Sequence, residues 1–396
     1  MIPNQWYAIL ESRSLKSKRP VGIMRMGERL VLWRDGEGKA VCMPDRCAHR
    51  GTALSIGNVV NGTIACRYHG LRYDCNGDCV RVPAHGEGYR IPKSLKVKPY
   101  TIKEQYGLIW LWWGEERANL PEIPWLDDIP RDPRECISKS EIWPFNYARL
   151  TENQFDVQHW AFLHGAIMFG VGDYFESYNC EVKDDTIHTW GNLRRGNKKN
   201  DPKNLWAWRV SMRFPNLSMI EVAPRFRSLA IATPVDDVTS WLLVRSYQTF
   251  SRIFPLRQMI DLYCIHFLYS VPLYRQDFPV WQSQTPWYTD VGVNKLVPCD
   301  EGIAKYLSIR RKLIAEANAD KEKKPAIETA KTKGSNGNYP IPQRKIPDDA
   351  RNAHIGVEPP FGQAKAWAKA MLAYPLLVPS LLASRAMGKL GDSKKN

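Results

Sequence analysis

The chain has 396 residues, which is enough for two domains and an appended segment. Hydrophobic residues make up 44% and charged residues 24%, as is typical of a soluble globular protein with a large core. The net charge of +15 comes from basic residues spread along the chain without a recognisable nucleic-acid-binding module. We therefore expect no nucleic-acid partner and favour an acidic protein or an anionic membrane surface.

The nine cysteines are an odd number and do not form the dense, even set of a small secreted scaffold. Residues 1–14 lack a basic stretch followed by an apolar one, so no signal-peptide pattern is visible. Both features predict a reducing, cytoplasmic setting in which free thiols are available to metals.

Residues 1–118 are predicted to form a β-rich domain. Short apolar runs at Arg29–Trp33, Ala40–Met43 and Leu108–Trp113 are bounded by turn-forming residues, as are the strands of a small sandwich or barrel. The Asn-Gly pair at 76–77 predicts a hairpin turn.

A Pro- and Asp-rich stretch, Leu120–Arg134, marks the expected domain boundary, and a second domain is predicted over 135–317. Its first segment, Ala148–Phe162, contains no Gly or Pro and is compatible with a helix. The other expected elements are strands over 185–250 and helices over 256–284 and 300–317.

The C-terminal part changes character twice. Residues 318–360 are rich in Lys, Pro, Asn and Gly, which predicts a flexible linker. The tail at 361–396 contains an uncharged run, Ala370–Ser384, that is shorter than the roughly 20 residues of a standard membrane span. Peripheral membrane contact through this tail and docking on the protein's own surface both fit the pattern.

The most informative segments each pair one cysteine with one histidine. The first is Cys47-x-His49, and the second, after sixteen intervening residues, is Cys66-x-x-His69. In a Rieske [2Fe–2S] centre one iron takes two cysteines and the other takes two histidines, and these pairs supply that set. Structural zinc is the alternative, but zinc modules usually pair like ligands, which argues against it.

The segments Cys47–Ser55 and Cys66–Gly70 closely resemble the signature of the Rieske non-haem iron oxygenases. Ala48 and Leu71 depart from the commonest pattern of that family, and neither is a ligand position. The resemblance implies one Rieske cluster per chain. It also implies an α+β fold: an N-terminal all-β Rieske domain, then a catalytic domain with a central antiparallel sheet flanked by helices, as in helix-grip proteins.

A second constellation follows in the order Asp156-x₂-His159-x₄-His164. Non-haem Fe(II) oxygenases bind their metal through two histidines and one carboxylate, which leaves other coordination positions open. Asp156 is predicted to lie on the same helical face as His159. Taken alone, an Asp and two His on one predicted helix would be weak evidence for a metal site. Downstream of a Rieske signature, this order resembles the mononuclear iron motif of the same family, which makes His159 and His164 ligands of one Fe(II).

The resemblance implies further roles in this region. Asp156 would link an iron-bound histidine to the Rieske His69 of a neighbouring subunit and so carry electrons across the interface. Asn153 would support the site from outside the ligand set.

The third iron ligand must come from a distant carboxylate. Asp277 is assigned this role because it stands in a Gln-Asp context in a late predicted helix, as the ligand does in the family. Asp261 and then Asp290 are the alternatives. Pro279, two residues after Asp277, is expected to bend that helix.

By resemblance, the chain is a terminal oxygenase that uses O₂ to hydroxylate or demethylate an apolar or aromatic small molecule. A ring cis-dihydroxylating dioxygenase is the alternative, and a Rieske electron-transfer protein is a more remote one. The most similar branch contains the vanillate and dicamba demethylases and pheophorbide a oxygenase-like proteins, which implies a homotrimer. Because no G-x-G-x-x-G nucleotide motif is present, electrons from NAD(P)H would arrive through a separate ferredoxin or ferredoxin reductase.

Overall fold

The computed structural model describes residues 1–165, 171–194, 205–223, 226–248, 256, 259–260 and 272–323. The chain divides into two compact units, Met1–Lys324 and Pro325–Asn396. The second unit lies outside the described residues, and with it most of the predicted linker and the whole tail at 361–396. No helix within the described ranges combines the length and the apolar character needed to cross a bilayer.

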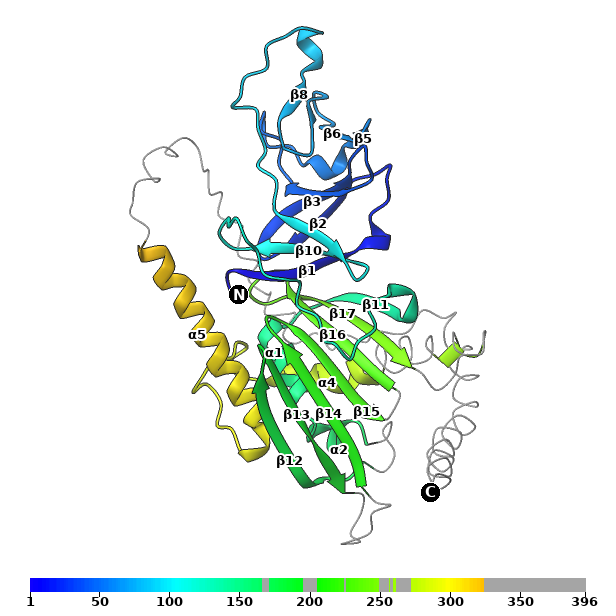
Figure 1. The fold of residues 1–396 in the computed structure, drawn as a ribbon, viewed down its shortest axis with the longest axis vertical. Helices are drawn as coiled ribbons and strands as arrows, with labels where there is room; N and C mark the ends of the chain where they lie inside the picture. The colour runs from blue at the N-terminus through cyan, green and yellow to red at the C-terminus, as the bar shows by residue number, and fades with distance from the viewer. Residues whose placement is uncertain are drawn as a thin grey trace, which may run out of the picture. The chain divides into compact units, whose positions relative to one another are not determined.

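Three small antiparallel sheets form the N-terminal domain (Figure 1). The first has the order β1 (Gln5–Glu11), β10 (Leu108–Trp113), β9 (Ile102–Gln105). The second is β2 (Val21–Arg25), β3 (Glu28–Arg34), β4 (Ala40–Pro44). The third is β5 (Asn58–Val60), β6 (Thr63–Ala65), β7 (Arg72–Tyr73), β8 (Cys79–Arg81).

The strands predicted from apolar runs are confirmed as β3, β4 and β10, and the Asn-Gly pair lies in the turn between β7 and β8. Gly77 has a φ of +80°, and a Cβ at this position would lie 1.8 Å from the carbonyl oxygen of Val97. Only glycine therefore fits this turn, both for its backbone angle and for its close approach to the backbone of Val97.

One seven-stranded antiparallel sheet organises the C-terminal domain, which confirms the predicted α+β class. Its order is β11 (Ile137–Trp143), β17 (Ser240–Gln248), β16 (Phe226–Pro234), β15 (Leu217–Ala223), β14 (Leu205–Arg213), β13 (Thr186–Arg194), β12 (Tyr174–Lys183). Strand β11 therefore comes from the start of the domain and forms one edge, beside the last strand of the sheet.

The two faces of this sheet bury two different cores, because side chains alternate along each strand. On β17, Leu242 and Val244 belong to the core that includes residues of the helices. Leu243 and Tyr247 belong to a second core shared with β1, β10 and the segment at 120–129. The sheet is thus covered on both sides, and β17 is buried along its whole length.

The helices α1 (Tyr147–Phe155), α2 (His159–Leu163) and α4 (Pro272–Ser283) lie on one face of the sheet (Figure 1). The continuous helix expected over 148–162 is wrong, because the backbone leaves the helical region at Asp156 (φ −78°, ψ 85°). Asp156 and His159 are consequently not on one helical face. Pro279 lies inside α4.

Helix α5 (Glu301–Lys323) extends six residues beyond the predicted start of the linker at 318. Residues 318–323 contain only Asn, Ala, Asp, Lys and Glu, and no Gly or Pro interrupts the helix before Pro325. The boundary at 317 was therefore placed too early.

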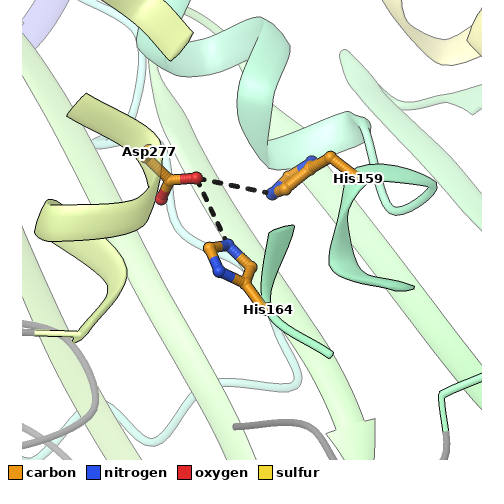
Figure 2. Close-up of side chains that lie close together, drawn as sticks. All are labelled: His159, His164 and Asp277. Atoms are coloured by element: carbon orange, nitrogen blue, oxygen red, sulfur yellow. Dashed lines mark ion pairs between the residues drawn. The ribbon is translucent and has the colours of Figure 1, made fainter. Parts of the chain in front are cut away.

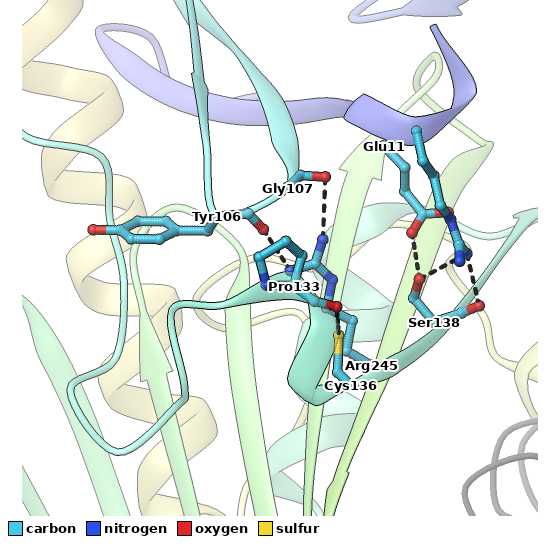
Figure 3. A network of polar contacts seen from close by, with 8 residues as sticks. Glu11, Tyr106, Gly107, Pro133, Cys136, Ser138 and Arg245 are labelled. Atoms are coloured by element: carbon cyan, nitrogen blue, oxygen red, sulfur yellow. Dashed lines mark hydrogen bonds and ion pairs between the residues drawn. The ribbon is translucent and has the colours of Figure 1, made fainter. Parts of the chain in front are cut away.

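Polar contacts fasten the N-terminal domain to the large sheet (Figure 3). The buried Arg245 on β17 donates to the carbonyl oxygens of Tyr106 (2.7 Å) and Gly107 (3.3 Å) in the β9–β10 turn. At the start of β11, the Ser138 hydroxyl donates to Glu11, and Arg13 donates to Ser138 Oγ (2.8 Å). These contacts, together with the shared core, hold the two domains in one unit.

Candidate metal centres

Two loops of the N-terminal domain carry the predicted cluster ligands and share one internal hydrogen-bond pattern. The N–H of Cys47 and that of Cys66 each donate to the carbonyl five residues further on, at 2.8 Å in both loops. Gly51 and Gly70 each donate back to the cysteine carbonyl, at 2.9 Å in both. Both glycines have positive φ, +73° and +71°, which other residues rarely adopt.

The cysteines of these loops are buried and the histidines are exposed. Cys47 and Cys66 are 2% and 3% exposed and belong to the core of the domain. The imidazoles of His49 and His69 lie on the surface with their ring centroids 4.8 Å apart. The arrangement fits a cluster with one inner iron bound by thiolates and one outer iron bound by imidazoles.

Tyr73 lies in the same buried core as Cys47 and Cys66. Its hydroxyl oxygen is 3.2 Å from Cys47 Sγ, and both groups are buried. Burial raises the pKa of Tyr73 far above its usual value, so the hydroxyl stays protonated and is available as a donor. When Cys47 is a metal-bound thiolate, this contact is a hydrogen bond from Tyr73 to the ligand sulfur.

The second site brings together three of the predicted residues from separate elements (Figure 2). His159 begins α2, His164 follows its last turn, and Asp277 comes from α4. Asp277 Oδ1 lies 3.3 Å from His164 Nε2 and 3.9 Å from His159 Nε2. All three ligand atoms lie within 4.8 Å of one another.

Neighbouring groups orient the two imidazoles of this cluster. His164 Nδ1 lies 2.8 Å from Gln276 Oε1, so the amide oxygen accepts from an Nδ1–H and leaves the Nε2 lone pair directed toward Asp277. On the other imidazole, His159 Nδ1 faces Asp156 Oδ2 at 3.5 Å. Both histidines thus present Nε2 to a common point.

The donor set fits a metal ion. Asp277 is 4% exposed, yet its Oδ1 has no hydrogen-bond partner among the described residues. A buried, unpaired carboxylate oxygen is costly unless a cation compensates it. Donor atoms on one ion with bonds of about 2.0–2.2 Å would be about 3 Å apart, close to the separation of Asp277 from His164. Two imidazoles and one carboxylate are also the set that non-haem Fe(II) prefers.

Asp156 ends α1 beside this cluster. Its side chain is 37% exposed, and its Oδ1 accepts from the His159 N–H at 3.3 Å. Burial alone would raise the pKa of Asp156, but the interactions with His159 and the N–H of Gln158 outweigh it and lower the pKa. The carboxylate therefore remains charged.

Asn153 accepts a hydrogen bond from Trp281 Nε1 at 3.2 Å, which joins α1 to α4. Asn153 and Asp156 also line a polar cavity of about 170 Å³. The other residues that line it are Arg149, Glu152, Trp281, Gln284, Asn294, Leu296, Asp300 and Ile303. Asp156 is thus both a lining residue of this cavity and a neighbour of His159.

Asp290, one of the two alternative carboxylates, does not join the cluster. Asp290 pairs with Arg311 at 3.4 Å, and Asp261 lies outside the described residues. Near the histidines, Trp160 is buried in the core and Phe162 is 72% exposed. The structure thus gathers His159, His164 and Asp277 and places Asp290 elsewhere.

Sequence reasoning missed two residues that contact the candidate ligands, Tyr73 and Gln276. Gln276 directly precedes Asp277, but nothing in the sequence indicates that its amide reaches a histidine 112 residues away. Tyr73 follows the second ligand loop closely, and only its burial and the fold of β7 direct its hydroxyl at Cys47. Cys79, on the next strand, is buried, and Cys75 is exposed.

Comparison with known proteins adds independent information. The model of the Rieske [2Fe-2S] domain family matches residues 5–101. The protein TIC 55 of Arabidopsis thaliana is 29% identical over 251 residues, covering 61% of this chain and 46% of TIC 55. Methylxanthine N1-demethylase NdmA of Pseudomonas putida is 29% identical over 336 residues, covering 81% of this chain and 89% of NdmA.

The chain spans less than half the length of the TIC 55 proteins it matches, 46% in Arabidopsis thaliana and 36% in Pisum sativum. Among solved structures, dicamba monooxygenase bound to dicamba aligns with a TM-score of 0.60 at 23% identity, over 81% of this chain and 99% of that one. NdmA with theobromine aligns with a TM-score of 0.64 at 23% identity, over 81% and 92%. These structural likenesses establish the fold.

The matched Rieske domain spans both candidate cluster loops, which begin at Cys47 and Cys66. The first domain is of the type that carries a [2Fe–2S] cluster. The chain therefore contains a Rieske [2Fe–2S] domain over residues 5–101 and shares over 81% of its length the fold of dicamba monooxygenase and NdmA.

Proposed function

We propose that this chain is the terminal oxygenase component of a Rieske system, with the Rieske domain at 1–118 and the catalytic domain at 135–323. The observation that carries the proposal is the position of Asp277. Its buried Oδ1 has no hydrogen-bond partner among the described residues and lies within 4 Å of the Nε2 atoms of His159 and His164. A Rieske protein that only transfers electrons has no need for this second, buried donor set.

Each centre has its own residues in this proposal. Cys47, His49, Cys66 and His69 would hold a [2Fe–2S] cluster, and His159, His164 and Asp277 would hold one Fe(II). When bound, the cluster would supply single electrons and the Fe(II) would supply open coordination positions for O₂. Gln276 and Asp156 would fix the two imidazoles so that both Nε2 atoms stay available.

Asp156 would join the two centres across two copies of the chain. The imidazole of His69 is exposed on one copy, and the charged carboxylate of Asp156 is partly exposed beside the polar cavity. A hydrogen bond between them would place the carboxylate between the His69 ring and the His159 ring. This arrangement requires a ring of copies, and a homotrimer is the form that the family resemblance implies.

The electron donor would be a separate acidic protein, a ferredoxin or a ferredoxin reductase. Between Arg46 and Tyr73 the sequence contains four arginines and no acidic residue. Arg46, Arg50 and Arg67 are exposed around the histidines and form no ion pair within the described part of the chain. Such a surface accelerates association with an acidic partner in a salt-dependent way.

The substrate would be an apolar or aromatic small molecule that is hydroxylated or demethylated. This class is supported by the names of the relatives, among them methylxanthine N1-demethylase NdmA and dicamba O-demethylase. A 3-chlorobenzoate-3,4-dioxygenase oxygenase subunit is also among them, at 32% identity over 164 residues. Monooxygenation is therefore proposed, and dioxygenation is the alternative that the experiment must distinguish.

The experiment is a substrate screen under ¹⁸O₂ with a reconstituted donor. Aromatic ethers, N-methylated heterocycles and aromatic acids are offered, and mass spectrometry counts labelled oxygen in the product. One labelled atom, or loss of a methyl group, supports monooxygenation, and two labelled atoms support dioxygenation. Asp156→Asn should keep both metal centres and lose substrate-dependent turnover. If no compound draws electrons from the cluster although both centres are full, the proposal is wrong.

A further inference from the structure

A pair of tryptophans joins the candidate iron site to the edge of the large sheet. Trp281 lies four residues after Asp277 on α4, which is about 6 Å along the helix axis and roughly the same side. The indoles of Trp281 and Trp143 pack with their ring centroids 5.2 Å apart at an angle of 50°. Both side chains are buried, with exposures of 9% and 6%.

The two tryptophans have different neighbours. An aromatic ring packs against Trp281, and a carboxylate that can accept a proton lies beside Trp143. Phe145 packs against Trp281 with ring centroids 5.1 Å apart, and Trp281 also lines the polar cavity beside Asp156. Trp143 Nε1 donates to Glu141 Oε2 at 3.3 Å. Glu141 is 38% exposed, is paired with Lys139 at 2.5 Å, and lies on the edge strand β11. The outer indole thus has a proton acceptor at the surface.

We propose that Trp281, Trp143 and Glu141 form an oxidant-escape relay, which protects the iron site when it is oxidised without a substrate to react with. This inference rests on the proposed function, because it requires iron at His159, His164 and Asp277. An indole loses an electron more easily than an aliphatic or a phenylalanine side chain, and electron transfer between rings in contact is fast. Packing alone would explain two buried tryptophans, but it does not require the carboxylate on the outer indole.

The electrons and protons in the relay balance. One electron passes from Trp281 to the oxidised metal site, and one electron then passes from Trp143 to Trp281. The Nε1 proton of Trp143 moves to the Glu141 carboxylate. In sum, the metal site gains one electron, Trp143 becomes a neutral indolyl radical, and Glu141 is protonated. A soluble one-electron reductant such as ascorbate restores Trp143, and the proton returns to it from Glu141.

The test uses the full chain with both centres loaded, treated with hydrogen peroxide in the absence of substrate. Peptide mass spectrometry then locates oxygen added to tryptophan, and iron and sulfide are measured on the same samples. Trp160, next to His159, serves as the marker of direct attack near the metal. Trp241, in the core on the other face of the sheet, serves as the remote control.

The relay predicts oxidation of Trp143 and none of Trp241, and it predicts that ascorbate suppresses the product at Trp143. In Trp281→Phe, oxidation of Trp143 should fall to the level of Trp241, while Trp160 is still oxidised. In Glu141→Gln, which leaves the metal site and Trp281 intact, the Trp143 product should also be lost. In Trp143→Phe, oxidation should accumulate at Trp281.

Two results would overturn the relay alone: an iron-loaded chain in which Trp143 stays unmodified, or one in which Trp281→Phe leaves oxidation of Trp143 unchanged. Glu141→Gln keeps the test decisive should Trp281→Phe fail to fold. A chain that retains no iron beyond its cluster would contradict the proposed function itself, and the relay with it.

Discussion

The hydroxyl of Tyr73 lies 3.2 Å from the sulfur of Cys47, in the buried core beneath the two candidate cluster loops. A hydrogen bond to a ligand sulfur stabilises the reduced cluster, because reduction adds negative charge that the sulfur shares. The residue thus connects the fold of β7 to the redox properties of the site.

Tyr73→Phe should therefore lower the reduction potential of the cluster. A hydrogen bond of about 1 kcal/mol corresponds to about 40 mV for one electron, so a decrease of this order is expected. Protein-film voltammetry or an EPR-monitored redox titration measures it. Tyr68→Phe is the matched control, because the exposed hydroxyl of Tyr68 has Arg50 as its neighbour, at 3.5 Å, and the backbone N–H that donates to Cys66 is unchanged by the substitution. Equal potentials in wild type and Tyr73→Phe would show that the contact has no such effect.

Gln276 should govern metal affinity at the second site without being a ligand. Gln276→Ala removes the acceptor from His164 Nδ1, which frees the imidazole to rotate, and iron should bind about 10–100-fold more weakly. Gln276→Glu restores an acceptor and should recover the affinity. Anaerobic Fe(II) titration measures both. Gln284→Ala is the control, because Gln284 lines the polar cavity and forms no hydrogen bond with either histidine within the described part of the chain; the affinity for iron should stay unchanged. If Gln284→Ala weakened iron binding as much as Gln276→Ala, a specific role of Gln276 would be refuted.

Arg245 should contribute strongly to the attachment of the N-terminal domain. Arg245→Met leaves the Tyr106 carbonyl without its side-chain donor and removes the longer of two hydrogen bonds to the Gly107 carbonyl, which keeps the bond from the Ser12 N–H. It should lower the free energy of unfolding by about 2 kcal/mol. Denaturant unfolding of the holoprotein measures the change. Arg13→Met is the control at the same interface: the Arg13 side chain is 63% exposed, so less than about 1 kcal/mol should be lost. Similar losses in the two variants would be the contrary result.

The ion pair between Arg34 and Glu104 should make stability depend on pH. The two terminal guanidinium nitrogens, Nη1 and Nη2, donate to Glu104 at 2.9 Å, and this hydrogen bonding lowers the pKa of Glu104. Because the folded pKa is depressed, the stabilisation is present above the unfolded pKa of about 4.3 and is lost as the pH falls through the folded pKa.

Glu104→Gln should accordingly be less stable than wild type by about 1 kcal/mol at pH 7. The two proteins should converge as the pH is lowered below about 4. Thermal unfolding at several pH values gives this comparison. Glu37→Gln is the control, since Glu37 and its partner Lys39 are 73% and 74% exposed and should show no difference at any pH. A gap between wild type and Glu104→Gln that persists at low pH would contradict the account.

The candidate cluster ligands could be proposed from the sequence because the pattern that carries them is local. Each Cys–His pair lies in one short loop, and the loop closes on itself through two backbone hydrogen bonds and one glycine. Spacing in the sequence therefore determines much of the geometry of each half-site. The strands β3, β4 and β10 could also be predicted from the sequence, since their apolar runs are bounded by turn-forming residues.

The second site depends on contacts that the sequence does not encode locally. Asp277 reaches His159 and His164 only because α4 packs over the same face of the sheet as α1 and α2. Its selection over Asp290 came from family context and not from any periodicity. Gln276 and Trp281 could not be assigned for the same reason, because their roles appear only when α4 meets α1.

The helix expected over 148–162 failed at Asp156 for a physical reason. The Asp side chain accepts from the backbone N–H of His159, and such local bonds compete with continuation of a helix. The break gives α2 a direction of its own, so His159 and His164 converge on Asp277 although they are five residues apart. The absence of Gly and Pro from the segment concealed this break.

The central claim is that one chain carries two separate iron sites. The direct test is iron and sulfide analysis with EPR on anaerobically reconstituted protein, for wild type, His164→Ala and Cys66→Ser. The account predicts one iron per chain beyond the two of the cluster, loss of that iron alone in His164→Ala, and loss of the cluster signal in Cys66→Ser. Wild-type protein that never holds iron beyond its cluster, or His164→Ala that retains all of it, would contradict the account.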